Sequence, residues 1–173
     1  MKKRLRIEYF LVAAVMLLLF VGSIAATNFF FQKEMVAQQE TYLRRKNTLL
    51  TDQLPPSVFE KGQLTNQQQL LVTHALDDAE ERVTLLQKNG TVFFDSSQNE
   101  PLESHKKRPE IAAVLSGATY GSALRKSKTL NKELLYVATP VLKSGEIVGI
   151  IRISEQTALF SKNIQSFRRY IIF

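Results

Sequence analysis

Two basic side chains, His105 and Arg108, lie in a segment whose residue types suit the binding of an anion. Pro109 follows them and is favoured in the first turn of a helix, so a short helix is predicted to begin there. Amide groups at the start of a helix attract negative charge, and Arg108 would stand beside them. The alternative, which we prefer, is that Arg108 pairs with Glu110 or Asp95 and fastens this segment to a neighbouring sheet.

A second polar group, formed by Arg125, Ser127 and Thr129, alternates along one predicted strand. Side chains two residues apart point to the same face of a strand, so these three share a face. With Tyr136 from the next predicted strand, they could line a ligand pocket. The same face could instead be a solvated or hydrogen-bonded edge. Together with the preceding pair, these residues are the candidate site for a small anionic ligand.

Catalytic and metal-binding patterns are not found in the sequence. Four acidic residues could suggest a carboxylate pair for hydrolysis or calcium binding, but their spacing fits no binding loop and we expect solvated charges: Asp95, Glu100, Glu103 and Glu110. The two histidines, His74 and His105, are far apart, which makes a metal site improbable. Nucleophile elbows, phosphate-binding loops and dinucleotide fingerprints are absent. We therefore predict no catalytic residue, metal or cofactor in these 173 residues.

The net charge of +7 reflects the two ends of the chain. Residues 33–167 hold 17 basic and 15 acidic side chains. The basic ones are scattered except for Lys106-Lys107-Arg108 and form no stripe with interleaved aromatics, so nucleic acid is not expected as a partner. The absence of cysteine excludes disulfides, thiol catalysis, Cys-based zinc sites and a lipoprotein anchor.

Residues 9–31 contain no charged side chain and are predicted to form a transmembrane helix. At ~1.5 Å per residue they span roughly 34 Å, enough for a hydrocarbon core of about 30 Å. Basic residues in the preceding tail, residues 1–8, place that tail in the cytoplasm by the positive-inside rule. A signal peptide cleaved near Ser23-Ile24-Ala25 is the alternative, but the apolar run is too long and continues past that point.

Beyond the apolar run, a helix over residues 32–54 is predicted to pack one face on a domain or on a second copy, because apolar pairs recur every seven residues. Pro55-Pro56 ends it. The Asn89-Gly90 pair predicts a hairpin, because both turn positions need positive φ. The other predicted elements are helices over residues 66–81, 109–115 and 155–169, strands over 82–87, 92–95, 120–127, 134–142 and 147–154, and an apolar run over 170–173.

This order predicts an α+β domain with a five-stranded antiparallel sheet flanked by helices. An anchor, a single domain and the onset of a second apolar segment resemble the extracytoplasmic half of a bacterial transmembrane receptor. The element order resembles the PAS-like sensory domain called Cache or PDC. Residues 32–167 would be the extracytoplasmic domain, with residues 168–173 the onset of a second transmembrane helix.

Short motifs resemble the ectodomain of phosphate-regulon sensor histidine kinases of the PhoR type. They cover roughly residues 82–159: an Asp95-Ser96 pair after the hairpin, an H-x-x-R-P-E segment from His105, R-x-S-x-T from Arg125, and the strands over 135–141 and 149–154. Ser104 stands where the family usually has Asn. The resemblance implies a parent kinase that uses ATP and Mg, whereas the phosphoacceptor helix and ATP-binding lid are missing from these residues.

Three functional hypotheses follow. The first is the sensory domain of a two-pass, homodimeric sensor kinase, which relays a signal, or contact with an envelope or transporter protein, through its juxtamembrane helices. The second is the same domain on another output, such as a chemoreceptor or a cyclase. The third is a single-anchor envelope protein that binds a partner. The sequence does not name the ligand, and the phosphate branch is the weaker part of the resemblance.

Overall fold

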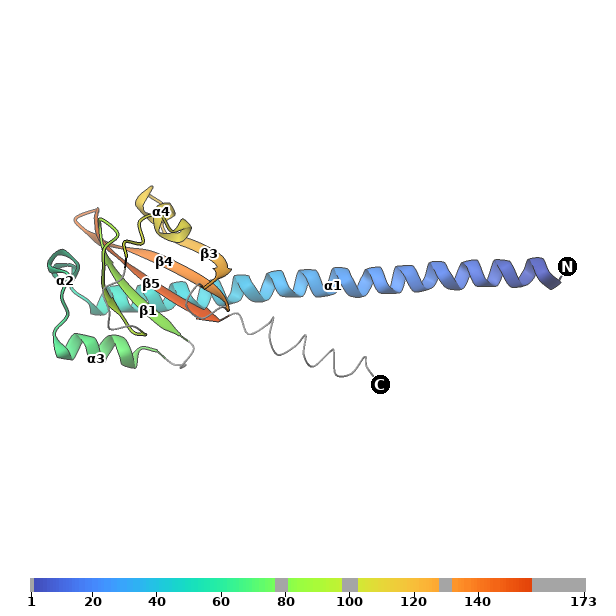
Figure 1. Ribbon diagram of the computed structural model, residues 1–173, viewed down its shortest axis with the longest axis horizontal. Coiled ribbons are helices and arrows are strands. Elements are labelled where there is room, and N and C mark those ends of the chain that lie inside the picture. The colour runs from blue at the N-terminus through green and yellow to red at the C-terminus, as the bar shows by residue number, and fades with distance from the viewer. Residues whose placement is uncertain (1, 77–80, 98–102, 128–131, 157–173) are drawn as a thin grey trace. The chain divides into compact units, whose positions relative to one another are not determined.

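A computed structural model describes residues 2–76, 81–97, 103–127 and 132–156, without the side chains of residues 2–5 (Figure 1). The chain divides into two units, Met1–Ala37 and Gln38–Phe173. Helix α1, Lys2–Gln53, supplies the first unit and the opening part of the second.

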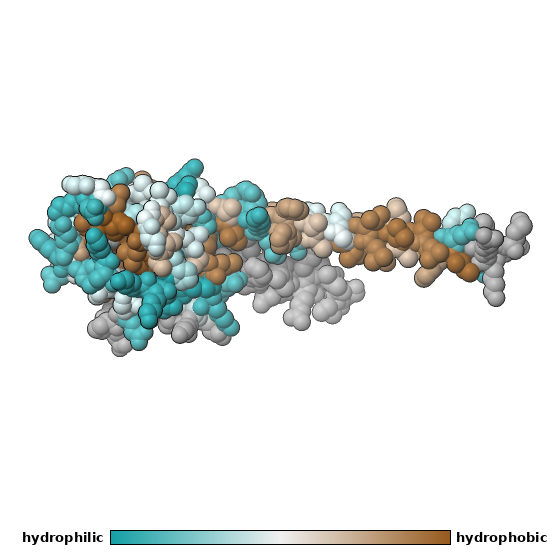
Figure 2. Space-filling model, turned by 90° about the horizontal axis from the view of Figure 1, so that it is seen from above, coloured by the Kyte–Doolittle hydropathy of each residue, from teal (hydrophilic) through white to brown (hydrophobic). Residues whose placement is uncertain are grey.

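The first unit is a helix whose apolar side chains are exposed on every side. From residue 6 to residue 31, all side chains but one are exposed, and they form much of the brown surface in Figure 2. A helix that is apolar all round needs an apolar environment to cover it. Among the described residues, one helix segment, Arg6–Gln53, is long and apolar enough to cross a membrane, and its apolar window is unburied.

Two short helices follow α1. As predicted, Pro55-Pro56 lies just beyond the end of α1, but Pro56 also begins helix α2, Pro56–Lys61, which the sequence did not reveal. Helix α3, Asn66–His74, begins with a capping box in which Thr65 and Gln68 exchange side-chain and backbone hydrogen bonds. The prediction that this helix reaches residue 81 is wrong, because Ala75 already caps its end.

The five predicted strands form one antiparallel sheet in the order β2-β1-β5-β4-β3. They are β1 Arg82–Gln87, β2 Val92–Asp95, β3 Gly121–Lys126, β4 Glu133–Lys143 and β5 Glu146–Gln156. The hairpin itself is confirmed, but the expectation of positive φ at both turn positions is wrong: Gly90 has a φ of 85°, which a glycine adopts without strain, whereas Asn89 does not have a positive φ. Strand β5 runs two residues beyond its predicted end, so the predicted helix over 155–169 does not begin at Glu155. The rest of that helix, and residues 168–173, lie outside the described residues.

One face of the sheet carries the part of α1 that belongs to the second unit. Leu43, Asn47, Leu50 and Leu54 are buried at the spacing of one helical face. The Asn47 side chain donates a 2.9 Å hydrogen bond to the carbonyl of Val137 in β4. The prediction that this helix packs one face on a domain is therefore confirmed, although only one member of each apolar pair in this region is buried.

The opposite face carries helix α4, Pro109–Leu115, at its predicted position. Its Ile111 and Val114 join an apolar core that includes three strand residues, Leu86, Ala138 and Ile150. The first turn of α4 lies directly on β3, because a Cβ on Gly121 would collide with the carbonyl oxygen of Glu110. This face of the sheet therefore divides into an apolar half under α4 and a polar half beside it.

Candidate functional site

The polar half of the α4 face holds a buried ionic cluster. It consists of three arginines, two carboxylates, a threonine and a tyrosine: Arg82, Thr84, Asp95, Glu110, Arg125, Tyr136 and Arg152. Antiparallel register brings the strand residues to one face, because Thr84 is paired with both Asp95 and Arg152. Residues from all five strands and from α4 therefore converge on one place.

Asp95 is the first of the two carboxylates. Arg82 Nε donates to both of its oxygens, at 2.8 and 2.9 Å, and Thr84 Oγ1 donates at 2.9 Å. The backbone N–H and hydroxyl of Ser97 donate to Oδ1 at 3.0 and 2.9 Å. Burial by itself raises the pKa of Asp95, but these hydrogen bonds outweigh it and hold the pKa below the ordinary value. Asp95 is therefore a structural anion.

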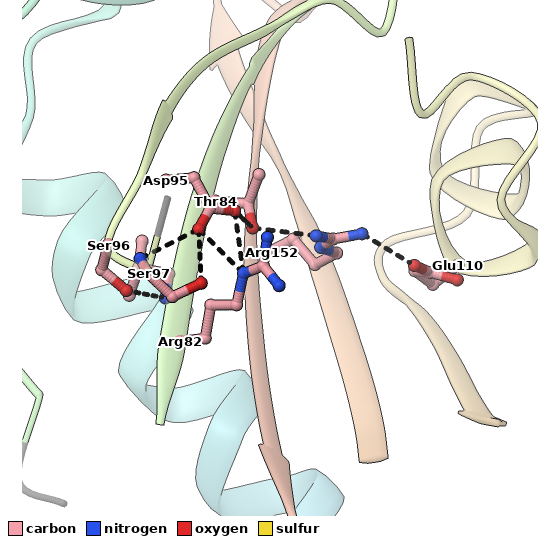
Figure 3. Close-up of polar contacts among 8 residues, drawn as sticks. Arg82, Thr84, Asp95, Ser96, Ser97, Glu110 and Arg152 are labelled. Carbon is pink, nitrogen blue, oxygen red and sulfur yellow. Dashed lines mark hydrogen bonds and ion pairs between the residues drawn. The ribbon is translucent and has the colours of Figure 1, made fainter. Parts of the chain in front are cut away.

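Glu110 is the second carboxylate, and it is completely buried. Its Oε1 accepts hydrogen bonds from Arg125 Nη2 at 3.0 Å and from Arg152 Nη1 at 3.4 Å. Arg152 Nη2 also donates to Thr84 Oγ1 at 2.9 Å, which links the Glu110 and Asp95 halves of the cluster (Figure 3). Burial lowers the pKa of Arg152 to about 10, so this guanidinium still carries its charge at neutral pH.

The ring of Tyr136 supports two of the guanidinium groups. The Cζ atom of Arg125 lies 3.6 Å from the ring centroid and that of Arg152 lies 5.1 Å from it. A guanidinium within about 6 Å of the centroid of an aromatic ring is attracted by the electron-rich face of that ring. The tyrosine therefore holds both cations independently of the acidic residues.

Several buried polar atoms around this cluster have no hydrogen-bond partner within the described part of the chain. They are His105 Nδ1, Glu110 Oε2, Arg125 Nε, Arg152 Nε and Ser154 Oγ. Buried polar atoms are usually paired, so such a concentration indicates unused binding capacity. The cluster holds three guanidiniums against two carboxylates, so its formal charge is positive. The arrangement therefore favours a further anionic group.

His105 does not add to this charge at neutral pH. Only 7% of its surface is exposed, and burial, with the positive charges of Arg152 and Arg108, lowers its pKa to about 4. Its backbone N–H donates to the carbonyl of Gly90, so it ties the segment before α4 to the hairpin. The neutral imidazole leaves one unpartnered nitrogen near the cluster.

The structure brings together some of the predicted site residues and corrects other predictions. Arg125 and Tyr136 do meet, and Ser127 is buried just beyond β3, whereas Thr129 lies outside the described residues. The preferred pairing of Arg108 with Asp95 or Glu110 is wrong, because Arg82 pairs with the first and Arg125 and Arg152 with the second. Arg108 instead occupies the N-cap position of α4.

The expectation that Asp95 and Glu110 are solvated charges is also wrong, since both are buried. Sequence reasoning missed Arg82, Thr84 and Arg152 as members of the cluster. One signal was available: Arg152 interrupts the apolar, β-branched run of β5, where an unpaired charge would be costly. In the described residues, no group of three or more acidic or histidine side chains is placed to hold a metal ion.

Comparisons with known proteins agree with this architecture. No curated protein matches the sequence. Among solved structures, the sensor domain of the Vibrio cholerae histidine kinase DctB aligns with a TM-score of 0.60 at 17% identity, covering 76% of this chain and 54% of that one. The ligand-binding domain of the Campylobacter jejuni chemoreceptor Tlp3, in complex with 4-methylisoleucine, aligns with a TM-score of 0.56 at 13% identity, covering 75% and 56%.

An extracellular ligand-binding receptor from Desulfohalobium retbaense aligns with a TM-score of 0.55 at 10% identity, covering 72% of this chain and 24% of the receptor. At such identities the likeness concerns the fold alone, and the chain spans a little over half of the length of the DctB and Tlp3 domains. The sequence itself matches the family model described as Single Cache-like over residues 52–156, which is more than half of the chain. The chain therefore belongs to the Single Cache-like family of sensory domains.

Proposed function

We propose that this chain is the extracytoplasmic signal-input part of a membrane sensor histidine kinase. The observation that carries the proposal is the combination of a Single Cache-like domain and an exposed apolar helix in one short chain. In this proposal residues 1–8 are cytoplasmic, residues 9–31 span the membrane, residues 32–167 lie outside, and residues 168–173 begin a second span. The parent protein would use ATP and Mg for autophosphorylation.

The proposed input is a small anion or a protein contact. Arg125 and Tyr136 belong to the buried ionic cluster and His105 lies beside it, and the cluster's positive formal charge and unused donors support an anionic ligand. Ser127, which is buried just beyond β3, stays in the proposal from the strand alternation. Arg108 flanks the cluster, and Thr129 remains part of the proposal from the strand alternation. A phosphate-starvation response rests on the motif resemblance alone. An envelope or transporter protein is the alternative input.

A chemoreceptor is the second candidate, because the sensory domain of chemoreceptor Tlp3 aligns almost as well as that of the kinase DctB. The output module decides between the two, and the described domain suits either. A cyclase output and a single-anchor envelope protein remain further alternatives with less support. The proposed assembly is a homodimer in either receptor class.

Topology in intact cells tests the proposal. Because the chain has no cysteine, single cysteines at Lys88, on the exposed hairpin, and at Arg6 give clean labelling sites. We expect a membrane-impermeant maleimide to label Lys88→Cys on intact cells and Arg6→Cys only after permeabilisation. Protection of Lys88→Cys on intact cells would place the domain inside and refute an extracytoplasmic sensor.

A further inference from the structure

Glu110 uses only part of the binding capacity of the two guanidiniums around it. Its Oε1 serves both Arg125 Nη2 and Arg152 Nη1, while its Oε2 has no partner among the described residues. The Nε atoms of both arginines are buried and unpartnered. A guanidinium binds an oxyanion best through two parallel N–H groups, and neither arginine does so here. Glu110 therefore uses only part of the hydrogen-bonding capacity of the Arg125 and Arg152 guanidiniums.

The two guanidiniums are held in position by groups other than Glu110. The ring of Tyr136 lies against both, and Thr84 Oγ1 accepts from Arg152 Nη2. Removal of the Glu110 carboxylate would thus leave two adjacent, preorganised cations. An oxyanion with two or more free oxygens could then use the Nε edges that Glu110 leaves empty.

The cation pair is accessible at one end. The side chain of Arg125 is 22% exposed on β3, one of the two edge strands of the sheet, whereas those of Arg152 and Glu110 are buried. Glu110 belongs to the first turn of α4, which is only seven residues long. A small shift of that turn would open the pair without unfolding the sheet.

We propose that Glu110 is a built-in competitor that occupies an oxyanion site formed by Arg125 and Arg152. A small ligand that carries a carboxylate or phosphate group displaces Glu110 and frees the first turn of α4 from the sheet. This proposal rests on the sensory function proposed above and specifies its ligand class and its first structural response. The site differs from a simple pocket because, in the absence of ligand, the carboxylate of Glu110 already occupies it.

The test measures anion binding to the 173-residue chain in nanodiscs, with inorganic phosphate and malonate as separate probes in a chloride buffer. Glu110→Gln keeps the shape and removes the competing charge. While Glu110 occupies the site, only the fraction of molecules with an open site can bind a ligand, which weakens the apparent affinity. Glu110→Gln should therefore bind at least one probe more tightly than the unaltered chain does, by about tenfold or more. The probe that gains affinity distinguishes phosphate from dicarboxylate ligands.

Matched variants assign the effect to the cation pair. Arg125→Gln added to Glu110→Gln should abolish the gain, while Lys107→Gln, which removes an exposed surface charge, should leave it unchanged. A folded Glu110→Gln variant that binds neither probe more tightly than the unaltered chain would overturn the proposal. The maleimide result is independent of this outcome, so an extracytoplasmic sensor can stand when the competitor mechanism fails.

A second measurement covers the case in which Glu110→Gln does not fold. In the unaltered chain, saturating phosphate or malonate should speed amide hydrogen exchange in residues 110–115 relative to chloride, because displaced Glu110 no longer holds α4. The strand β5 should be unaffected. Unchanged exchange in α4 with both probes would overturn the proposal.

Discussion

At the scale of single residues, the buried ionic cluster is stable only because each charge has a partner. Breaking a buried ion pair on one side leaves an uncompensated charge and typically costs about 3–5 kcal/mol. Arg152 contacts Glu110, Thr84 and the Tyr136 ring at once. It is therefore the residue whose loss should disturb the cluster most.

We expect Arg152→Met to lower the free energy of unfolding by about 3 kcal/mol or more, because Glu110 would lose a buried cation. Urea unfolding followed by near-ultraviolet circular dichroism measures this change. Adding Glu110→Gln to Arg152→Met should recover part of the loss, since the uncompensated charge disappears. An Arg152→Met variant as stable as the unaltered chain would show that the cluster is not a structural unit.

The buried imidazole of His105 predicts a pH dependence of stability. Its pKa falls from 6.5 to about 4 on folding, so between these values the unfolded chain binds a proton that the folded chain does not. The stability is fully present above pH 6.5 and falls as the pH drops toward 4, by at most about 1.4 kcal/mol per pH unit. Urea unfolding from pH 7.5 to pH 4.5 measures the slope.

Two histidine variants make this test specific. His105→Asn should flatten the slope, whereas His74→Asn should leave it unchanged, because His74 is exposed. Asp95 also contributes stability through its lowered pKa, but this contribution is lost as the pH falls below the ordinary pKa of 3.8. That pH lies outside the range of the measurement. Equal slopes for His105→Asn and the unaltered chain would contradict the assignment.

At the scale of elements, α1 is joined to the sheet by specific polar contacts as well as by apolar packing. Asn47 is fully buried and donates to the Val137 carbonyl, and Gln39 Nε2 donates to Glu155 Oε2 in β5 at 2.8 Å. A buried hydrogen bond of this kind fixes which turn of the helix faces which strand. Such a contact is suited to couple movements of the sheet to the helix.

We expect Asn47→Ala to lower the free energy of unfolding by about 1–3 kcal/mol, because it leaves the Val137 carbonyl without its side-chain donor and opens a small cavity. It should also speed amide exchange in residues 43–53 of α1. Thr48→Ala, at an exposed position of the same helix, should change stability by no more than about 0.5 kcal/mol. Equal effects of the two variants would argue against a specific role for Asn47.

Elements with a local signal could be predicted from the sequence. The hairpin at Asn89-Gly90 and the start of a helix at Asn66 each depend on neighbouring residues, and both are confirmed. Helix α2 was missed because its six residues are too short to show a periodicity, and the double proline suggested only an end. The extension of β5 depends on its pairing with β4, which no local pattern contains.

The site was only partly predictable for the same reason. The alternation along β3 and the order of the strands predicted that Arg125 lies near Tyr136, and the two residues are in contact. The pairing of Glu110 with Arg152 joins residues 42 positions apart. The prediction relied on closeness in sequence and therefore paired Glu110 with Arg108, which is wrong. Which arginine faces which carboxylate depends on strand register and on where α4 lies, and these are properties of the folded domain.

At the scale of the whole molecule, we expect the proposed homodimer to have its interface on α1. Leu49 is 60% exposed although the adjacent Leu50 is buried against the sheet. We expect Leu49→Cys to form intermolecular disulfides in membranes, since an interface brings the two Cα atoms within about 7 Å. Leu50→Cys is the matched control and should crosslink far less. Absence of crosslinking at Leu49 and at the other exposed positions along α1 would argue for a monomer.

We propose that this chain is the input part of a longer receptor kinase. The most direct measurement is the mass of the natural protein in its membranes, combined with labelling by radioactive ATP. We expect a protein that extends well beyond Phe173 and acquires acid-labile phosphate on histidine. A natural protein that ends near Phe173, or a longer one that takes up no phosphate from ATP, would contradict it.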